Sequence, residues 1–102
     1  MPAAPARITC PVDHPALPGH FPGRPIVPGV LLLDAVLQAV AAAEPGRAGP
    51  ARLVRAKFPA PVAPGVEVAI TLTPPGSDRV GFTCRCGDTI VLFGEFGWPV
   101  PR

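Results

Sequence analysis

One histidine and one aspartate stand in a mostly apolar stretch rich in proline and glycine, PGHFPGRPIVPGVLLLDAVLQAV (residues 18–40). His20 lies in a loop stiffened by prolines, and imidazole is the usual proton-transfer group at neutral pH. Asp34 follows within an aliphatic run, and Gln38 lies one helical turn further along the same face. Because a carboxylate in apolar surroundings is paired, hydrogen-bonded or kept protonated, we expect Gln38 to hold one oxygen of Asp34. The alternative is an acid that simply points to solvent.

Main-chain donors form the third element of this stretch. Pro28-Gly29 breaks the chain before a run without proline or glycine, so the N–H groups of Gly29 and Val30 lie at the positive end of a predicted helix. Such donors polarise a carbonyl oxygen and stabilise a developing enolate. A base, an acid and these donors together predict proton abstraction α to a carbonyl, with the acid assisting a leaving group at the β carbon.

The surrounding pattern predicts the elements that position these groups. Residues 30–43 form a helix that is apolar on all sides and therefore expected to be buried on every face, and residues 14–29 form a long ordered loop before it. Alternating patterns predict strands at residues 6–12, 53–58, 66–73, 79–86 and 89–96, with a type II′ hairpin turn at Gly87-Asp88. We expect a single domain over residues 1–102.

The composition indicates that part of the burial comes from a second chain. Of the 102 residues 48% are hydrophobic and 16% are charged, which is more apolar surface than a small monomer hides easily. The longest apolar run is interrupted by Asp34 and Gln38, and no signal peptide is recognisable, so we expect a cytoplasmic oligomer without a membrane span.

Charge and cysteine content exclude several classes of function. A net charge of +2 is too small for a nucleic-acid-binding footprint, and the modest cluster RLVRAK fits either a solvated rim or a docking patch for an acidic partner. The three cysteines show no CxxC spacing, so we expect reduced, buried thiols and no metal site.

The stretch GHFPGRPIVPGVLLLDAVLQ resembles the signature of the 3-hydroxyacyl-[acyl-carrier-protein] dehydratases, GHFPGxPxxPGVLxxEAxxQ, with Asp34 at the Glu position. The later KFPAPVAPGVEV is similar to the KFxxPVxPGD segment of that family. The resemblance implies an α+β hot-dog fold, in which an antiparallel sheet wraps around one long central helix. It also implies a homodimer with two shared active sites, while a higher oligomer or a heterodimer stays open.

The resemblance assigns roles to individual residues. His20 matches the catalytic histidine and Asp34 the catalytic acid, supplied by the other protomer. Gly29, with Val30 beside it, matches the donor to the thioester carbonyl, and Gln38 matches the residue that supports the acid. The substrate is carried on the phosphopantetheine of acyl carrier protein, and no other cofactor is implied. The remaining assignments are an acyl tunnel lined by Phe21, Val30 and Leu31, and carrier docking by Arg24, Arg52, Arg55 and Lys57.

The implied reaction is loss of water from a (3R)-3-hydroxyacyl thioester to give the trans-2-enoyl thioester, in fatty-acid or aryl-polyene-type biosynthesis. A short chain with aspartate at position 34 resembles the small dehydratases of aryl-polyene-type pigment clusters. Two alternatives stay open, a hot-dog acyl thioesterase and a non-catalytic hot-dog partner subunit. Acyl chain length, aryl or aliphatic substrate, and isomerisation of the double bond are not determined by the sequence.

Overall fold

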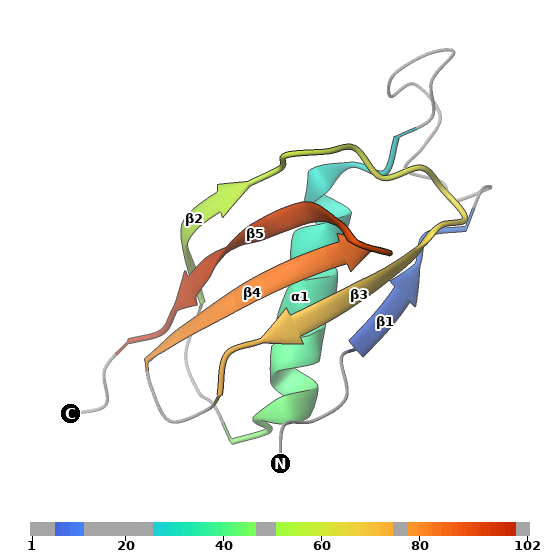
Figure 1. Cartoon of the computed structure of the whole chain (residues 1–102). Coiled ribbons are helices and arrows are strands. Elements are labelled where there is room, and N and C mark those ends of the chain that lie inside the picture. The colour runs from blue at the N-terminus through green and yellow to red at the C-terminus, as the bar shows by residue number, and fades with distance from the viewer. Residues whose placement is uncertain (1–5, 12–25, 47–50, 75–77, 100–102) are drawn as a thin grey trace.

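One helix packs against one antiparallel sheet (Figure 1). The computed structural model describes residues 6–11, 26–46, 51–74 and 78–99. Within them the elements are, in chain order, β1 (Ala6–Thr9), α1 (Gly29–Ala43), β2 (Arg52–Lys57), β3 (Glu67–Leu72), β4 (Arg79–Cys86) and β5 (Thr89–Gly97). The predicted helix and all the predicted strands are present. The first strand ends earlier than predicted, at Thr9, shortly before Pro11, whose missing N–H cannot continue a ladder.

The sheet has five strands in the order β1-β3-β4-β5-β2, and every neighbouring pair is antiparallel. The helix crosses one face of this sheet (Figure 1). The chain from β2 to β3 passes across the end of the sheet where α1 begins (Figure 1). The start of the helix is therefore covered by a connection that is distant from it in sequence.

The bounds of α1 follow from the residues that flank it. Pro28, with φ −58° and ψ 138°, is extended and places the chain for the first helical turn at Gly29. At the other end Glu44 precedes Pro45, and a residue before proline disfavours the α region. The N–H of Glu44 still donates to the carbonyl of Val40 at 2.8 Å, which closes the last turn.

Within the single chain the helix is fully buried along one stripe, half-buried on the flanks of that stripe and exposed on the opposite side. Leu32, Val36 and Val40 are buried against the sheet, because residues four apart share a face. Asp34 and Gln38 lie on the opposite side and are exposed. The prediction that α1 is buried on every face is therefore wrong for the chain by itself, since one sheet covers only one side of a helix.

The core lies between α1 and the sheet. Its centre is formed by aliphatic side chains of α1, β3, β4 and β5, and among the described residues no polar or charged side chain is buried. The rings of Phe82 and Phe96 pack within it at a centroid distance of 5.2 Å, with their planes tilted by 35°. The buried members are Val27, Leu32, Val36, Val40, Val62, Val68, Ile70, Val80, Phe82, Cys84, Val91, Leu92 and Phe96.

Two glycines shape the sheet. Gly87 has φ +59° in the two-residue connection between Cys86 and Thr89, as a primed hairpin turn requires. At Gly94 a Cβ atom would collide with the carbonyl oxygen of Arg55 on the neighbouring strand, and it would lie 2.9 Å from the Phe82 ring. Glycine at position 94 therefore permits the close packing of β5 against both β2 and the core.

Candidate active site

Asp34 and Gln38 form a hydrogen-bonded pair on the exposed side of α1. The side-chain N–H of Gln38 donates to Oδ2 of Asp34 at 2.7 Å, across one helical turn. This is the hydrogen bond expected from the sequence. Because Gln38 takes one carboxylate oxygen, the Oδ1 atom of Asp34 stays available to a group that approaches the exposed side of the helix.

The first turn of α1 supplies backbone donors. No described side chain caps this end of the helix, and the first turn holds no acidic residue. The N–H of Leu31 donates to the carbonyl of Pro28 at 3.0 Å, so Gly29 and Val30 remain as the leading donors at the positive end. Donors so placed suit a carbonyl oxygen that gains negative charge.

The two described residues predicted to line the acyl tunnel differ in their surroundings. The side chain of Val30 is 69% exposed, whereas Leu31 packs partly against the core. Val30 is thus not enclosed by the described part of this chain, and a tunnel along it needs a wall from elsewhere. His20, Phe21 and Arg24 lie outside the described residues, so their predicted roles stay predictions.

The connection from β2 to β3 holds the entry to α1. The N–H of Val27 donates to the carbonyl of Val62 at 2.8 Å, and both side chains are buried. Phe58 lies on the same connection, and its ring packs over Gly29. The alternating pattern placed Phe58 at the end of the strand predicted over residues 53–58, so its contact with the helix start was not predicted. The KF of the KFPAPVAPGVEV segment was the available signal.

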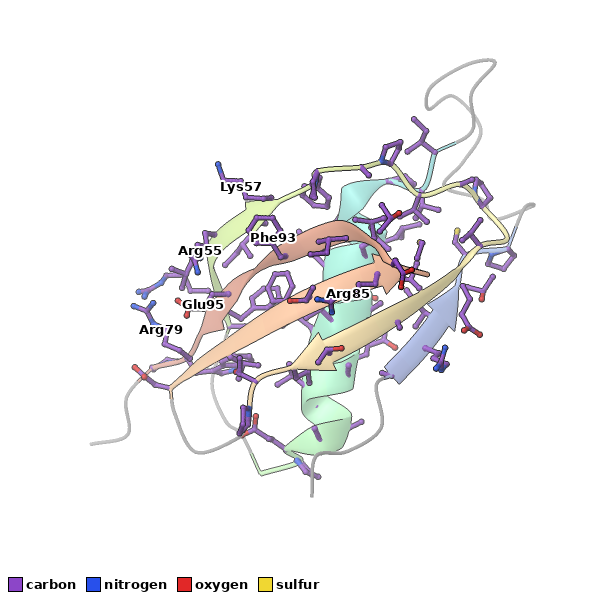
Figure 2. The ribbon with its side chains drawn as sticks, viewed as in Figure 1. Arg55, Lys57, Arg79, Arg85, Phe93 and Glu95 are labelled. Carbon is purple, nitrogen blue, oxygen red and sulfur yellow. The ribbon has the colours of Figure 1, made fainter. Side chains whose placement is uncertain are left out.

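Three of the predicted docking cations lie on β2, where Arg52, Arg55 and Lys57 are exposed. Arg55 is in register with Glu95 of β5, and Lys57 with Phe93. Glu95 and Phe93 alternate with buried residues along β5. They and their β2 partners therefore lie on the sheet face that points away from α1 (Figure 2). Figure 2 also shows Arg79 and Arg85 on β4, and Arg79 donates to Glu95 at 2.7 Å.

The cysteines belong to the core and its margin. All three are free thiols; Cys84 is buried, and Cys10 and Cys86 are half-buried. Burial raises the pKa of Cys84 to about 11, and the neighbouring Cys86 adds to the rise. Burial also raises the pKa of Cys86. In the described part of the chain no group of three or more His, Cys, Asp or Glu residues could hold a metal ion.

No helix among the described residues is long and apolar enough to cross a membrane.

The described residues form one helix on a five-stranded antiparallel sheet, and their superposition on solved structures identifies this arrangement as the hot-dog fold. The dehydratase heterocomplex ApeI:P from Xenorhabdus doucetiae matches with a TM-score of 0.76 and 20% identity, covering 95% of this chain and 96% of that one. A fluoroacetyl-CoA-specific thioesterase, FlK, matches with a TM-score of 0.67 and 14% identity, covering 89% and 83%. At these identities the likeness establishes the fold, which is common to both activities.

The family follows from sequence. Residues 3–94 match the family model described as ApeI-like, ApeI dehydratase. The chain therefore belongs to the ApeI-like dehydratase family. The 3-hydroxyacyl-[acyl-carrier-protein] dehydratases FabZ of Klebsiella pneumoniae and Salmonella arizonae are each 39% identical over a 71-residue alignment, which covers 61% of this chain and 47% of the relative. The chain thus matches about half the length of these curated relatives.

Proposed function

We propose that the protein is a dehydratase that converts a (3R)-3-hydroxyacyl thioester on acyl carrier protein to the trans-2-enoyl thioester and water. The observation that carries the proposal is the Asp34–Gln38 pair. The side-chain N–H of Gln38 donates to the Asp34 carboxylate at 2.7 Å, on the exposed side of the helix that begins at Gly29. Membership of the ApeI-like dehydratase family and the likeness to FabZ support the same reaction.

The proposed chemistry divides between three groups. The N–H of Gly29, with that of Val30 beside it, polarises the thioester carbonyl and acidifies the α carbon. His20 takes the α proton, and the electrons of that C–H bond form the new double bond between the α and β carbons. The bond from the β carbon to the hydroxyl oxygen breaks, and Asp34 gives that oxygen a proton directly or through a water that it holds. Water leaves, and the proton on His20 returns to Asp34 through solvent.

Gln38 has an orienting role in this scheme. Its hydrogen bond fixes one oxygen of Asp34 and leaves the other free to face the proposed substrate. All proton transfers use side chains, and the carbonyl is bound by main-chain N–H groups. The proposed reaction therefore needs no cofactor beyond the phosphopantetheine that carries the substrate.

We further propose that the site is shared between two copies of the chain, with His20 of one facing Asp34 of the other. The exposed side of α1 supports this assembly, because it leaves both Asp34 and the 69%-exposed Val30 open to a second chain. Among the described strands, β2 pairs with β5 alone, so its other edge is available to continue the sheet into a partner. A homodimer is the simplest such assembly, and the similarity to the dehydratase heterocomplex ApeI:P makes a heterodimer the alternative.

The carrier protein is proposed to dock beside β2. Carrier proteins are acidic, and Arg52, Arg55 and Lys57 offer exposed cations on this strand. Arg24, which lies outside the described residues, completes the set proposed from the sequence. Binding through these cations weakens as salt is added, since exposed charges are screened.

Mass spectrometry of a 3-hydroxyacyl carrier protein incubated with the purified chain tests the proposed function. Loss of one water from the acyl group, with the thioester intact, is the expected result. Release of the free 3-hydroxy acid would instead identify a thioesterase, the activity named for the structural neighbour FlK. An unchanged carrier would point to a non-catalytic partner subunit, and both of these results contradict the proposal.

A further inference from the structure

The ring of Phe58 occupies the space in which a side chain at position 29 would lie. A Cβ atom built on Gly29 would be 2.8 Å from both Cε1 and Cζ of Phe58. Carbon atoms in favourable contact are about 3.5–4.0 Å apart, so the ring rests directly on the Gly29 main chain. Position 29 is therefore closed to every larger residue while the ring is in place.

This contact supports the first turn of α1. The first turn of α1 has no side-chain cap among the described residues, so packing must set the direction of its N–H groups. The Val27–Val62 hydrogen bond of 2.8 Å anchors the chain just before the helix, and the Phe58 ring covers its first residue. One connection thus holds the helix start at two points.

The exposure of Phe58 sets it apart from a core residue. Its side chain is 48% exposed, although an aromatic ring gains most from full burial. The ring packs on Gly29, whose N–H is proposed to bind the thioester carbonyl, while part of Phe58 stays exposed.

We propose that Phe58 is a positioning residue for catalysis, which holds the N–H of Gly29 in the direction required to bind the substrate carbonyl. The inference rests on the proposed function. An oxyanion donor acts only when it lies about 2.7–3.1 Å from the developing charge, and a displacement of about 1 Å lowers the rate by a large factor. Removal of the ring is therefore expected to lower the rate of the chemical step more than the affinity for substrate.

The test compares three variants with the parent on a 3-hydroxyacyl pantetheine thioester, which avoids carrier docking. Phe58→Ala is expected to lower kcat about tenfold or more, with KM within about threefold of the parent, because the donor acts chiefly in the transition state. In Phe58→Leu the side chain still covers part of Gly29, so its kcat is expected to lie between the kcat of Phe58→Ala and that of the parent. The matched control is Phe93→Ala, since Phe93 is 39% exposed on the outer sheet face, and its kcat is expected to equal that of the parent.

A double-mutant cycle tests the contact independently of turnover. Gly29→Ala alone is expected to lower the melting temperature, because its methyl group meets the Phe58 ring at 2.8 Å. In the Phe58→Ala background the same change is expected to have little further effect, since the ring is gone. Equal losses in both backgrounds would show that the ring does not occupy this space.

The outcomes separate this inference from the proposed function. Suppose that the parent removes water and that folded Phe58→Ala and Phe58→Leu have the same kcat as Phe93→Ala. This result overturns the positioning role and leaves the proposed dehydratase function intact. A rise in KM without a fall in kcat overturns it as well. A parent that never removes water from the thioester overturns the dehydratase and, with it, the positioning role.

Discussion

Asp34 is exposed within its own chain, yet its carboxylate is oriented by a 2.7 Å hydrogen bond from Gln38. A solvated surface acid has no need of a fixed orientation, whereas a proton donor does. The arrangement therefore favours a chemical role for Asp34 at a surface that a second chain or a substrate covers.

Asp34→Asn tests this role at the scale of the residue. The amide cannot deliver the proton, so kcat is expected to fall about 10²–10⁴-fold, while the melting temperature changes little because the site is exposed. Asp34→Glu introduces the residue of the family signature. Because its carboxyl group can still deliver a proton, we expect this variant to keep most of the kcat of the parent. Steady-state kinetics and thermal melts measure both effects, and an Asp34→Asn protein with parental kcat would exclude Asp34 from the chemistry.

Cys84 gives the protein a pH dependence of stability on the alkaline side. Its pKa is raised from 9.0 to about 11 by burial, and secondarily by Cys86, so the unfolded chain loses this proton at lower pH than the folded one. The contribution of the Cys84 thiol to the free energy of unfolding is fully present below pH 9. It decreases as pH rises toward 11, and the total loss is up to about 3 kcal/mol. Urea unfolding of the parent and of Cys84→Ala at pH 8 and 10.5 measures it. We expect the parent to lose more stability than the variant, and equal losses would contradict the assignment.

At the residue scale the sequence predicted what depends on local spacing. The Asp34–Gln38 hydrogen bond follows from their separation by one helical turn, and it is present. The contact between Phe58 and Gly29 joins residues that are far apart in the chain, so no local pattern could reveal it. Side-chain burial on α1 also depends on what packs against the helix, and the expectation of all-round burial was wrong for one chain.

At the scale of the elements, alternation and proline placement predicted the strands and the helix well. The periodicity indicated β2 to β5 to within a residue or so, and Glu44-Pro45 marked the end of α1. The order β1-β3-β4-β5-β2 was not predictable from the residues alone, because it depends on long-range pairing. Register shifts in the β2–β5 and β4–β5 pairs were missed for the same reason.

Gly94→Ala tests the packing of β5 between its neighbours. The added methyl group meets the Arg55 carbonyl and the Ala56 Cα, so the strands must separate. We expect a loss of about 1–3 kcal/mol in the free energy of unfolding. Gly46→Ala is the matched control, since a Cβ there meets nothing within 4 Å. Thermal melts of the two variants compare the sites, and equal melting temperatures would show that β5 has more room than the structure indicates.

At the scale of the whole molecule, the chain leaves apolar surface uncovered. In the described part of the chain, the large apolar residues exposed to solvent are Val30, Leu53, Phe58, Val66, Ile90 and Phe93. A second copy that covers the exposed side of α1 would bury some of this surface, and in the proposed assembly it would also bring a His20 to each Asp34. The composition of the sequence indicated this need for a partner. The placement of the two chains depends on contacts between them, which the pattern of one sequence does not specify.

Complementation between two inactive variants tests the shared active site most directly. His20→Ala and Asp34→Asn chains carrying different tags are co-expressed, and the mixed dimers are purified through both tags. In a mixed dimer one site contains both mutations and the other contains neither, so dehydration of the 3-hydroxyacyl carrier is expected at about half the parental rate. Each variant alone is expected to be nearly inactive. Mixed dimers as inactive as the single variants would contradict a site built from His20 of one chain and Asp34 of the other.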